Sequence, residues 1–134
     1  MRSERGSLSL ELTLLVPVLL LVLGFIMGAA TIGRARSDLD DAAWEAARAA
    51  SLTRSGVDAD AAARQAVDQR LVGERWSCGN KNMDVDVSRF EPGGMVAVEI
   101  NCDVRLASAG LFVPGATHLH SRVAAPLDRY RALR

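Results

Sequence analysis

The 134-residue sequence is poor in aromatic residues and cysteine, and it has no excess of charge of either sign. Aromatic residues make up 4% of the chain and hydrophobic residues 49%, so most apolar side chains are aliphatic and we expect a thin soluble core. The formal net charge is zero, with 16 Lys and Arg against 16 Asp and Glu. Because the basic residues form no stripe of the kind that binds a phosphate backbone, nucleic acid is not an expected partner.

Motifs for catalysis are also missing from the sequence. It contains no G-x-S-x-G nucleophile elbow, no glycine-rich phosphate loop and no cysteine with plausible His and Asn partners. His118 and His120 have a spacing that places two metal ligands on one strand face, but no third or fourth ligand is evident nearby. Asp38, Asp40 and Asp41 lack the glycine and the closing glutamate of a calcium-binding loop. We therefore expect no enzyme activity, no metal, no cofactor and no small-molecule substrate.

One long hydrophobic run dominates the sequence. Residues 12–32 are 21 positions without a charge. As a helix they span about 31 Å, which matches the hydrocarbon thickness of a bilayer. A cleaved secretory signal is the alternative, since residues 28–30 are small, but the apolar part of such signals is only about 7 to 15 residues long. The run therefore predicts a transmembrane helix, with the lipid bilayer as a partner.

The charges that flank this run do not decide its orientation. Arg2 and Arg5 precede it, and Arg34 and Arg36 follow it, so the positive-inside rule is nearly balanced. Most of the chain, with both cysteines and a strand-like alternation, lies after the run. We therefore expect a single-pass protein of the cell membrane with a short cytoplasmic N-terminus and an extracytoplasmic C-terminal domain.

The two cysteines, Cys78 and Cys102, both follow the hydrophobic run. An even number of cysteines in an exported region predicts one disulfide, and a pair of free thiols is the alternative. Because small domains with thin cores depend on such bridges, the disulfide is the preferred interpretation.

Glu11 is a carboxylate at the N-terminal end of the hydrophobic run. A charge at the centre of a bilayer costs about 2.5 to 3.5 kcal/mol, and less near the interface, so a position at headgroup depth would explain this residue by itself. However, Gly6 lies five positions upstream, after a short charged leader, and the string Gly6-Ser7-Leu8-Ser9-Leu10-Glu11 opens the apolar run.

This arrangement resembles the prepilin peptidase site of type IV pilins and pseudopilins. The resemblance implies that residues 1–6 are a leader cut after Gly6, and that Glu11 becomes the fifth residue of a mature chain that starts at Ser7. It also implies that the N-terminal amine of a neighbouring subunit pairs with Glu11, which sets the register of assembly. Ser7 is a departure, because many pilins carry Phe after the cleaved glycine.

The run from Glu11 through Pro17 resembles the TadE-like proteins, minor pseudopilins of the Tad (Flp) pilus machinery, which carry a proline shortly after the glutamate. Residues 41–51 resemble their juxtamembrane helix, and residues 121–131 resemble their closing strand and tail. The resemblance implies a structural component that assembles with, primes or caps a Tad/Flp-type pilus or related secretion filament. Its partners would be prepilin peptidase and other pilin-like subunits or the Tad secretion machinery. The alternative is a single-pass membrane-anchored binding module with no filament role.

The proline and glycine residues inside the apolar run bear on how this helix bends and how closely another helix can pack against it. Pro17 has no amide donor and should loosen the preceding turn, although membrane helices tolerate such a kink without a function for it. Gly24 and Gly28 form a G-x-x-x-G pattern that can admit a second helix, although glycine is common in membrane helices generally.

The pattern after the membrane predicts an α+β fold. Leu39, Ala43, Ala46 and Ala50 have helical spacing, which predicts that the long helix continues as a stalk and ends near Gly56. A second amphipathic helix is predicted over residues 58–72, with five residues on its apolar face: Ala59, Ala63, Ala66, Val67 and Leu71.

Strand signals begin at Met83, where apolar and polar residues alternate through Ser88, and a turn is predicted at residues 91–94. The clearest alternation predicts a half-buried strand over residues 96–106. A third strand is expected over residues 117–125. The inward-pointing Cys102 would tie this small antiparallel sheet to residues 76–78, at the end of the second helix.

These predictions divide the chain into four parts. They are the leader (1–6), the transmembrane helix (7–33), the juxtamembrane stalk helix (34–56) and a small extracytoplasmic α+β domain (57–134).

Overall fold

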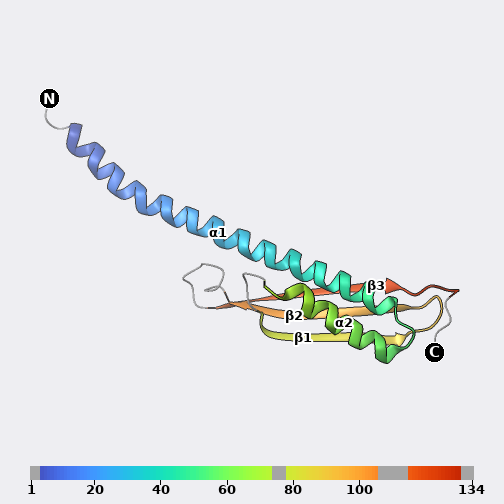
Figure 1. Ribbon diagram of the computed structural model, residues 1–134. Coiled ribbons are helices and arrows are strands. Elements are labelled where there is room, and N and C mark those ends of the chain that lie inside the picture. The colour runs from blue at the N-terminus through green and yellow to red at the C-terminus, as the bar shows by residue number, and fades with distance from the viewer. Residues whose placement is uncertain (1–3, 74–77, 106–114, 131–134) are drawn as a thin grey trace.

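The computed structural model describes residues 4–73, 78–105 and 115–130, with side chains from residue 11 onward. It contains two helices followed by three strands: α1 (Glu4–Ser51), α2 (Gly56–Leu71), β1 (Cys78–Arg89), β2 (Met95–Arg105) and β3 (Ala116–Pro126). The C-terminal part of α1 and the whole of α2 lie on one face of the sheet, and the N-terminal part of α1 projects well beyond it (Figure 1). The predicted α+β class, with a long apolar helix, a second helix and a three-stranded sheet, is confirmed.

The long helix α1 is built from residues that favour helical backbone. Leucine dominates its first half and alanine its second half, and both are strong helix formers. The helix ends at Ser51, where the amides of Leu52 and Thr53 donate to the carbonyl oxygens of Ala49 and Ala50 at 3.2 Å. Such bonds tighten the last turn and satisfy carbonyl groups that have no further helical partner.

The prediction that the stalk helix runs on to about Gly56 is wrong, because Gly56 is instead the first residue of α2. The preceding Ser55 is the N-cap of α2, and its Oγ accepts a hydrogen bond from the amide of Asp58 at 3.1 Å. A serine at this position satisfies one of the free amides at the start of a helix. The four residues between the two helices let α2 turn back along α1.

The sheet has the order β1-β2-β3, and both neighbouring pairs are antiparallel. The predicted turn at residues 91–94 connects β1 to β2, and the amide of Gly94 donates to the carbonyl of Glu91 at 2.8 Å. Gly93 has a φ of +80°, a left-handed conformation that favours glycine. Gly94 is also required, because a Cβ there would lie 2.1 Å from the carbonyl oxygen of Arg89.

The core lies between the inner face of the sheet and the two helices. The alternation predicted for β2 is confirmed, because its inward residues are all buried: Val96, Val98, Ile100, Cys102 and Val104. Leu106, predicted to continue this face, lies outside the described residues. The helices contribute mainly small side chains, with Leu39 as the largest fully buried one. The predicted thin core is therefore what the structure shows.

Helix α2 buries the predicted apolar face. Ala59, Ala63 and Val67 are fully buried, while Ala66 and Leu71 are partly buried against the same core. Small residues on α1 and α2 let the two helices approach closely, and α2 also contacts β1.

Strand β1 begins at Cys78, five residues before the predicted Met83. The sulfur atoms of Cys78 and Cys102 lie 2.09 Å apart, at disulfide distance. The expectation that this bridge ties the sheet to the end of the second helix is wrong, since Cys78 is itself part of the sheet. Trp76, named in that prediction, lies outside the described residues. The first part of β1 was missed because residues 79–82 are polar or glycine and lack the apolar alternation that marks a half-buried strand.

Candidate functional site

The candidate functional site is the surface of α1, which changes character along its length. Its first half carries exposed large apolar side chains at nearly every position from Leu12 to Met27. This half lies beyond the sheet and packs on no other element (Figure 1). By length and composition, α1 is the one helix of the described chain that could cross a membrane. These properties fit a single-pass membrane anchor.

Glu11 lies at the start of this apolar surface and is exposed. It makes no hydrogen bond or ion pair with any residue that the structure describes. Gly6 and Ser7 lie in the first turns of α1, four or five positions before Glu11. The structure therefore brings the three predicted processing and register positions onto one continuous helix, but it gives Glu11 no partner among the residues that it describes.

The predicted bending and packing positions also lie in this half of α1. The helix continues on both sides of Pro17 as a single element. A Cβ added at Gly24 would meet no atom within 4 Å, so its surface is open to a neighbour. Gly28 is buried. The two glycines of the G-x-x-x-G pattern therefore differ, and only Gly24 is open in the single chain.

The second half of α1 buries one face against the sheet and α2. Seven of its residues are essentially inaccessible: Ala35, Leu39, Ala42, Ala43, Ala46, Ala47 and Ala50. On the side toward α2, Arg70 lies 3.6 Å from the carboxylate of Asp41 and 3.8 Å from that of Glu45. The orientation of α1 on the domain is thus fixed by both apolar contact and charge.

A row of exposed residues winds along the second half of α1, from the edge of this buried face to the side away from it. Arg36, Asp40, Trp44 and Arg48 follow one another at four-residue spacing, and all four are exposed, Trp44 with 58% of its surface. We call these four residues the α1 ridge. Sequence reasoning did not select it, because it searched for apolar periodicity and the ridge is polar except for Trp44. The signal that could have found it is the i, i+4 spacing of charged residues around a tryptophan.

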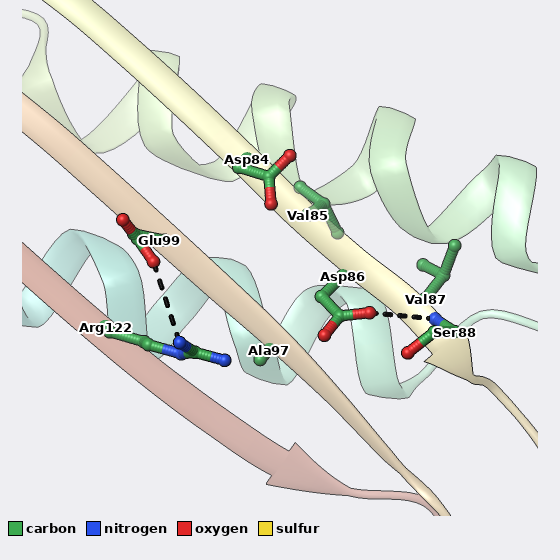
Figure 2. Close-up of a pocket in the computed structure, with 8 residues that line it drawn as sticks. All are labelled: Asp84, Val85, Asp86, Val87, Ser88, Ala97, Glu99 and Arg122. Carbon is green, nitrogen blue, oxygen red and sulfur yellow. Dashed lines mark hydrogen bonds and ion pairs between the residues drawn. The ribbon is translucent and has the colours of Figure 1, made fainter.

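The outer face of the sheet is polar and is hollowed near its middle, in a pocket of about 400 Å³. Asp84, Glu99 and Arg122, from three neighbouring strands, lie along one row of this face, and Arg122 Nη1 is 3.9 Å from Glu99 Oε2 (Figure 2). The hydrogen bonds that Asp86 accepts from the side chain and backbone of Ser88 lower the pKa of Asp86. This surface can interact with polar groups, but its ion pair is long and exposed.

His118 and His120 also lie on the outer face, as their spacing predicts. His118 Nδ1 pairs with Asp103 Oδ1, and His120 Nδ1 lies 2.9 Å from Asn101 Oδ1. Each histidine thus has a partner on β2, and the two do not converge on a common point. Within the described part of the chain, no three His, Cys, Asp or Glu residues are grouped to hold a metal ion.

The comparison with protein families gives a match over the helix that carries this site. The family model described as TadE-like protein matches residues 6–48. Residues 6–48 are TadE-like. No curated protein and no solved structure matches the chain.

The TadE-like segment coincides with the candidate site. It begins at Gly6, includes Glu11 and the whole apolar run, and ends at Arg48, the last residue of the α1 ridge. It stops before α2 and the sheet. A TadE-like segment indicates involvement in the Tad pilus and pilus-related partners in general. The resemblance therefore lies in α1, and the comparisons give no relative for α2 and the sheet.

Proposed function

We propose that this chain is a minor pseudopilin-like structural component that joins, primes or caps a Tad/Flp-type pilus or related secretion filament at the membrane. The observation that carries the proposal is Glu11, a carboxylate at the start of the exposed, uncharged run of α1 that has no hydrogen bond or ion pair with the described residues. An unpaired charge in or near hydrocarbon is costly. Cleavage after Gly6 would create an amine at Ser7, and the amine of a neighbouring subunit is a suitable partner for the carboxylate.

The proposed role is structural. The proposal also specifies how the chain is oriented in the membrane. The N-terminus faces the cytoplasm, where the peptidase acts, and α2 and the sheet are outside. The disulfide-distance pair Cys78–Cys102 supports an oxidising, extracytoplasmic location for the sheet. The proposal includes no catalytic role.

Cleavage is tested by Gly6→Ala in a host that carries prepilin peptidase. We expect wild type to shift to a shorter form whose N-terminal residue is Ser7, and the variant to remain at precursor size. Gly24→Ala is a matched control, because it alters another glycine of the same helix where a Cβ has open space. Unchanged mobility of the Gly6→Ala protein beside wild type would contradict the processing step.

The register role is tested separately by Glu11→Ala. We expect this variant to be cleaved normally, since Gly6 and Ser7 are intact, but to lose assembly, measured by crosslinking from the apolar helix in cells. Glu45→Ala is the control, because it removes an exposed carboxylate from the same helix outside the apolar run. Normal assembly of the Glu11→Ala protein would reject Glu11 as a register residue.

The second candidate function is a membrane-anchored binding module without a filament role. The hollow on the outer sheet face favours it, because that surface faces away from both helices and is open (Figure 2). N-terminal sequencing of the mature protein distinguishes the two functions. Ser7 as first residue supports the pseudopilin-like component, and an intact Met1 supports the binding module.

A further inference from the structure

The α1 ridge carries charged side chains of both signs that form no ion pair with the described residues. Arg36 and Asp40 have opposite charges and lie one turn apart, yet no ion pair joins them in the structure. Trp44 and Arg48, the next two members, are also exposed and have no side-chain hydrogen bond or ion pair with the described residues. An exposed tryptophan beside an arginine can form a cation–π contact, and tryptophan and arginine are enriched at protein interfaces.

The first two residues of the α1 ridge, Arg36 and Asp40, lie on the same side of the helix as Glu11. Arg36 is 25 residues after Glu11 and Asp40 is 29 residues after it. At 3.6 residues per turn these separations are about seven and eight turns, so the three side chains share one face of a continuous helix. A neighbour that contacts Glu11 is therefore positioned to contact the ridge outside the membrane as well.

Two copies anchored in one membrane with the same orientation present parallel α1 helices to each other. If they lie in register, Arg36 faces Arg36 and Asp40 faces Asp40, and like charges repel. A shift of one copy by four residues along the axis replaces these contacts. Arg36 of the shifted copy then faces Asp40 of the other, and Trp44 of the shifted copy faces Arg48.

We propose that the α1 ridge binds the ridge of a second copy of this chain, shifted by four residues, or about 6 Å along the helix. This inference rests on the proposed function, because the pairing of the Ser7 amine with Glu11 requires the same four-residue offset. A shift of eight residues would also oppose Asp40 to Arg48, but it would separate Ser7 from Glu11. The offset that satisfies the membrane pair is thus the one that pairs Arg36 with Asp40.

The test is co-purification of two differently tagged full-length copies from membranes that contain the peptidase. Arg36→Asp in both copies, or Asp40→Arg in both copies, should lower the co-purified fraction at least about threefold, since each change turns an attractive exposed pair into a repulsive one. Co-expression of one copy with Arg36→Asp and the other with Asp40→Arg should restore it. In that mixture position 36 of each copy faces the opposite charge at position 40 of the other.

Restoration of the co-purified fraction in the mixture distinguishes a contact between two copies from an ion pair within one helix, because another molecule cannot restore an intrachain pair. Asp60→Arg is the matched control: Asp60 and Arg64 form an exposed pair of the same spacing on α2, at 2.8 Å. It should leave the co-purified fraction unchanged.

The possible failures are distinguishable. If the single charge variants co-purify like wild type while Glu11→Ala does not, the ridge contact is overturned and the proposed function stands. Absence of rescue in the mixture also overturns the ridge contact. If wild-type copies bearing Ser7 at their N-terminus do not co-purify at all, self-association is rejected, whereas cleavage remains established by the same sequencing.

Discussion

The two halves of α1 form one continuous helix but lie in different surroundings. The first half exposes leucine, valine and phenylalanine on all sides, whereas the second half buries alanine on one side and exposes charge on the other. Among the described elements, only the second half packs on the sheet and α2. The apolar half therefore fits a membrane environment, while the alanine-rich half is stabilised by contacts within the molecule.

This difference determines where each half is sensitive to substitution. In the second half of α1, the free energy of unfolding of the domain depends on the packing of small and medium side chains. Leu39 is the largest of those that are fully buried. In the apolar half, no described residue of the chain packs on the leucines, so their truncation leaves no cavity within the protein. Substitutions of the same chemical type in the two halves should therefore have different effects on domain stability.

The largest expected effect comes from Leu39→Ala. Leu39 is 1% exposed in the core between α1 and the sheet, and truncating a buried leucine creates a cavity, which costs about 4 kcal/mol. The measurement is thermal unfolding of the detergent-solubilised protein, followed by circular dichroism of the sheet. Leu20→Ala is the matched control, because Leu20 is 63% exposed in the apolar half, and it should leave the transition unchanged. Equal losses in both variants would contradict the division of α1 into two environments.

The sequence predicted the features that depend on regular hydrophobic patterning. A run of uncharged residues identifies the apolar half of α1, and strict alternation identifies β2, whose inward-facing side chains are buried as expected. Both patterns are strong because the same environment acts on many consecutive residues.

The features that could not be predicted from the sequence depend on single contacts or on polar residues. The end of α1 is marked by the tight bonds from Leu52 and Thr53 to Ala49 and Ala50, and the start of α2 by the cap at Ser55, not by a change in hydrophobic spacing. At the start of β1, residues 79–82 are all exposed, so this part of the strand lacks alternation. The α1 ridge was missed for a similar reason, since exposed charges carry no apolar period.

A somewhat smaller effect is expected from replacing both Cys78 and Cys102 by serine. The two cysteines are 24 positions apart, and closing a loop of this size stabilises a fold by about 3 kcal/mol. The domain has a thin core, so we expect a clearly lowered unfolding temperature. The apolar half does not involve the bridge, and membrane retention of the variant should equal that of wild type. Membrane extraction and thermal unfolding measure the two properties separately, and unchanged unfolding would show that the bridge does not stabilise the domain.

The smallest expected effect concerns a surface carboxylate of the sheet. Glu11 makes no hydrogen bond or ion pair with the described residues, whereas Asp86 accepts hydrogen bonds from Ser88. The side-chain and backbone hydrogen bonds from Ser88 lower the pKa of Asp86 below 3.8. A lowered pKa in the folded state adds stability that is present above pH 3.8 and is lost as the pH falls through the folded-state value.

Asp86→Asn should therefore slightly lower the unfolding temperature near neutral pH, and its difference from wild type should shrink in acid. The carboxylate lies at the surface, so the change should be small beside that of Leu39→Ala. Thermal unfolding of both proteins across a pH series provides the measurement, with Glu91→Gln as a control for loss of an exposed carboxylate that makes no side-chain interaction with the described residues. A difference that grows in acid would have the wrong sign for a lowered pKa. The expected sign would show that the hydrogen bonds from Ser88 stabilise the ionised form of a surface carboxylate on the sheet.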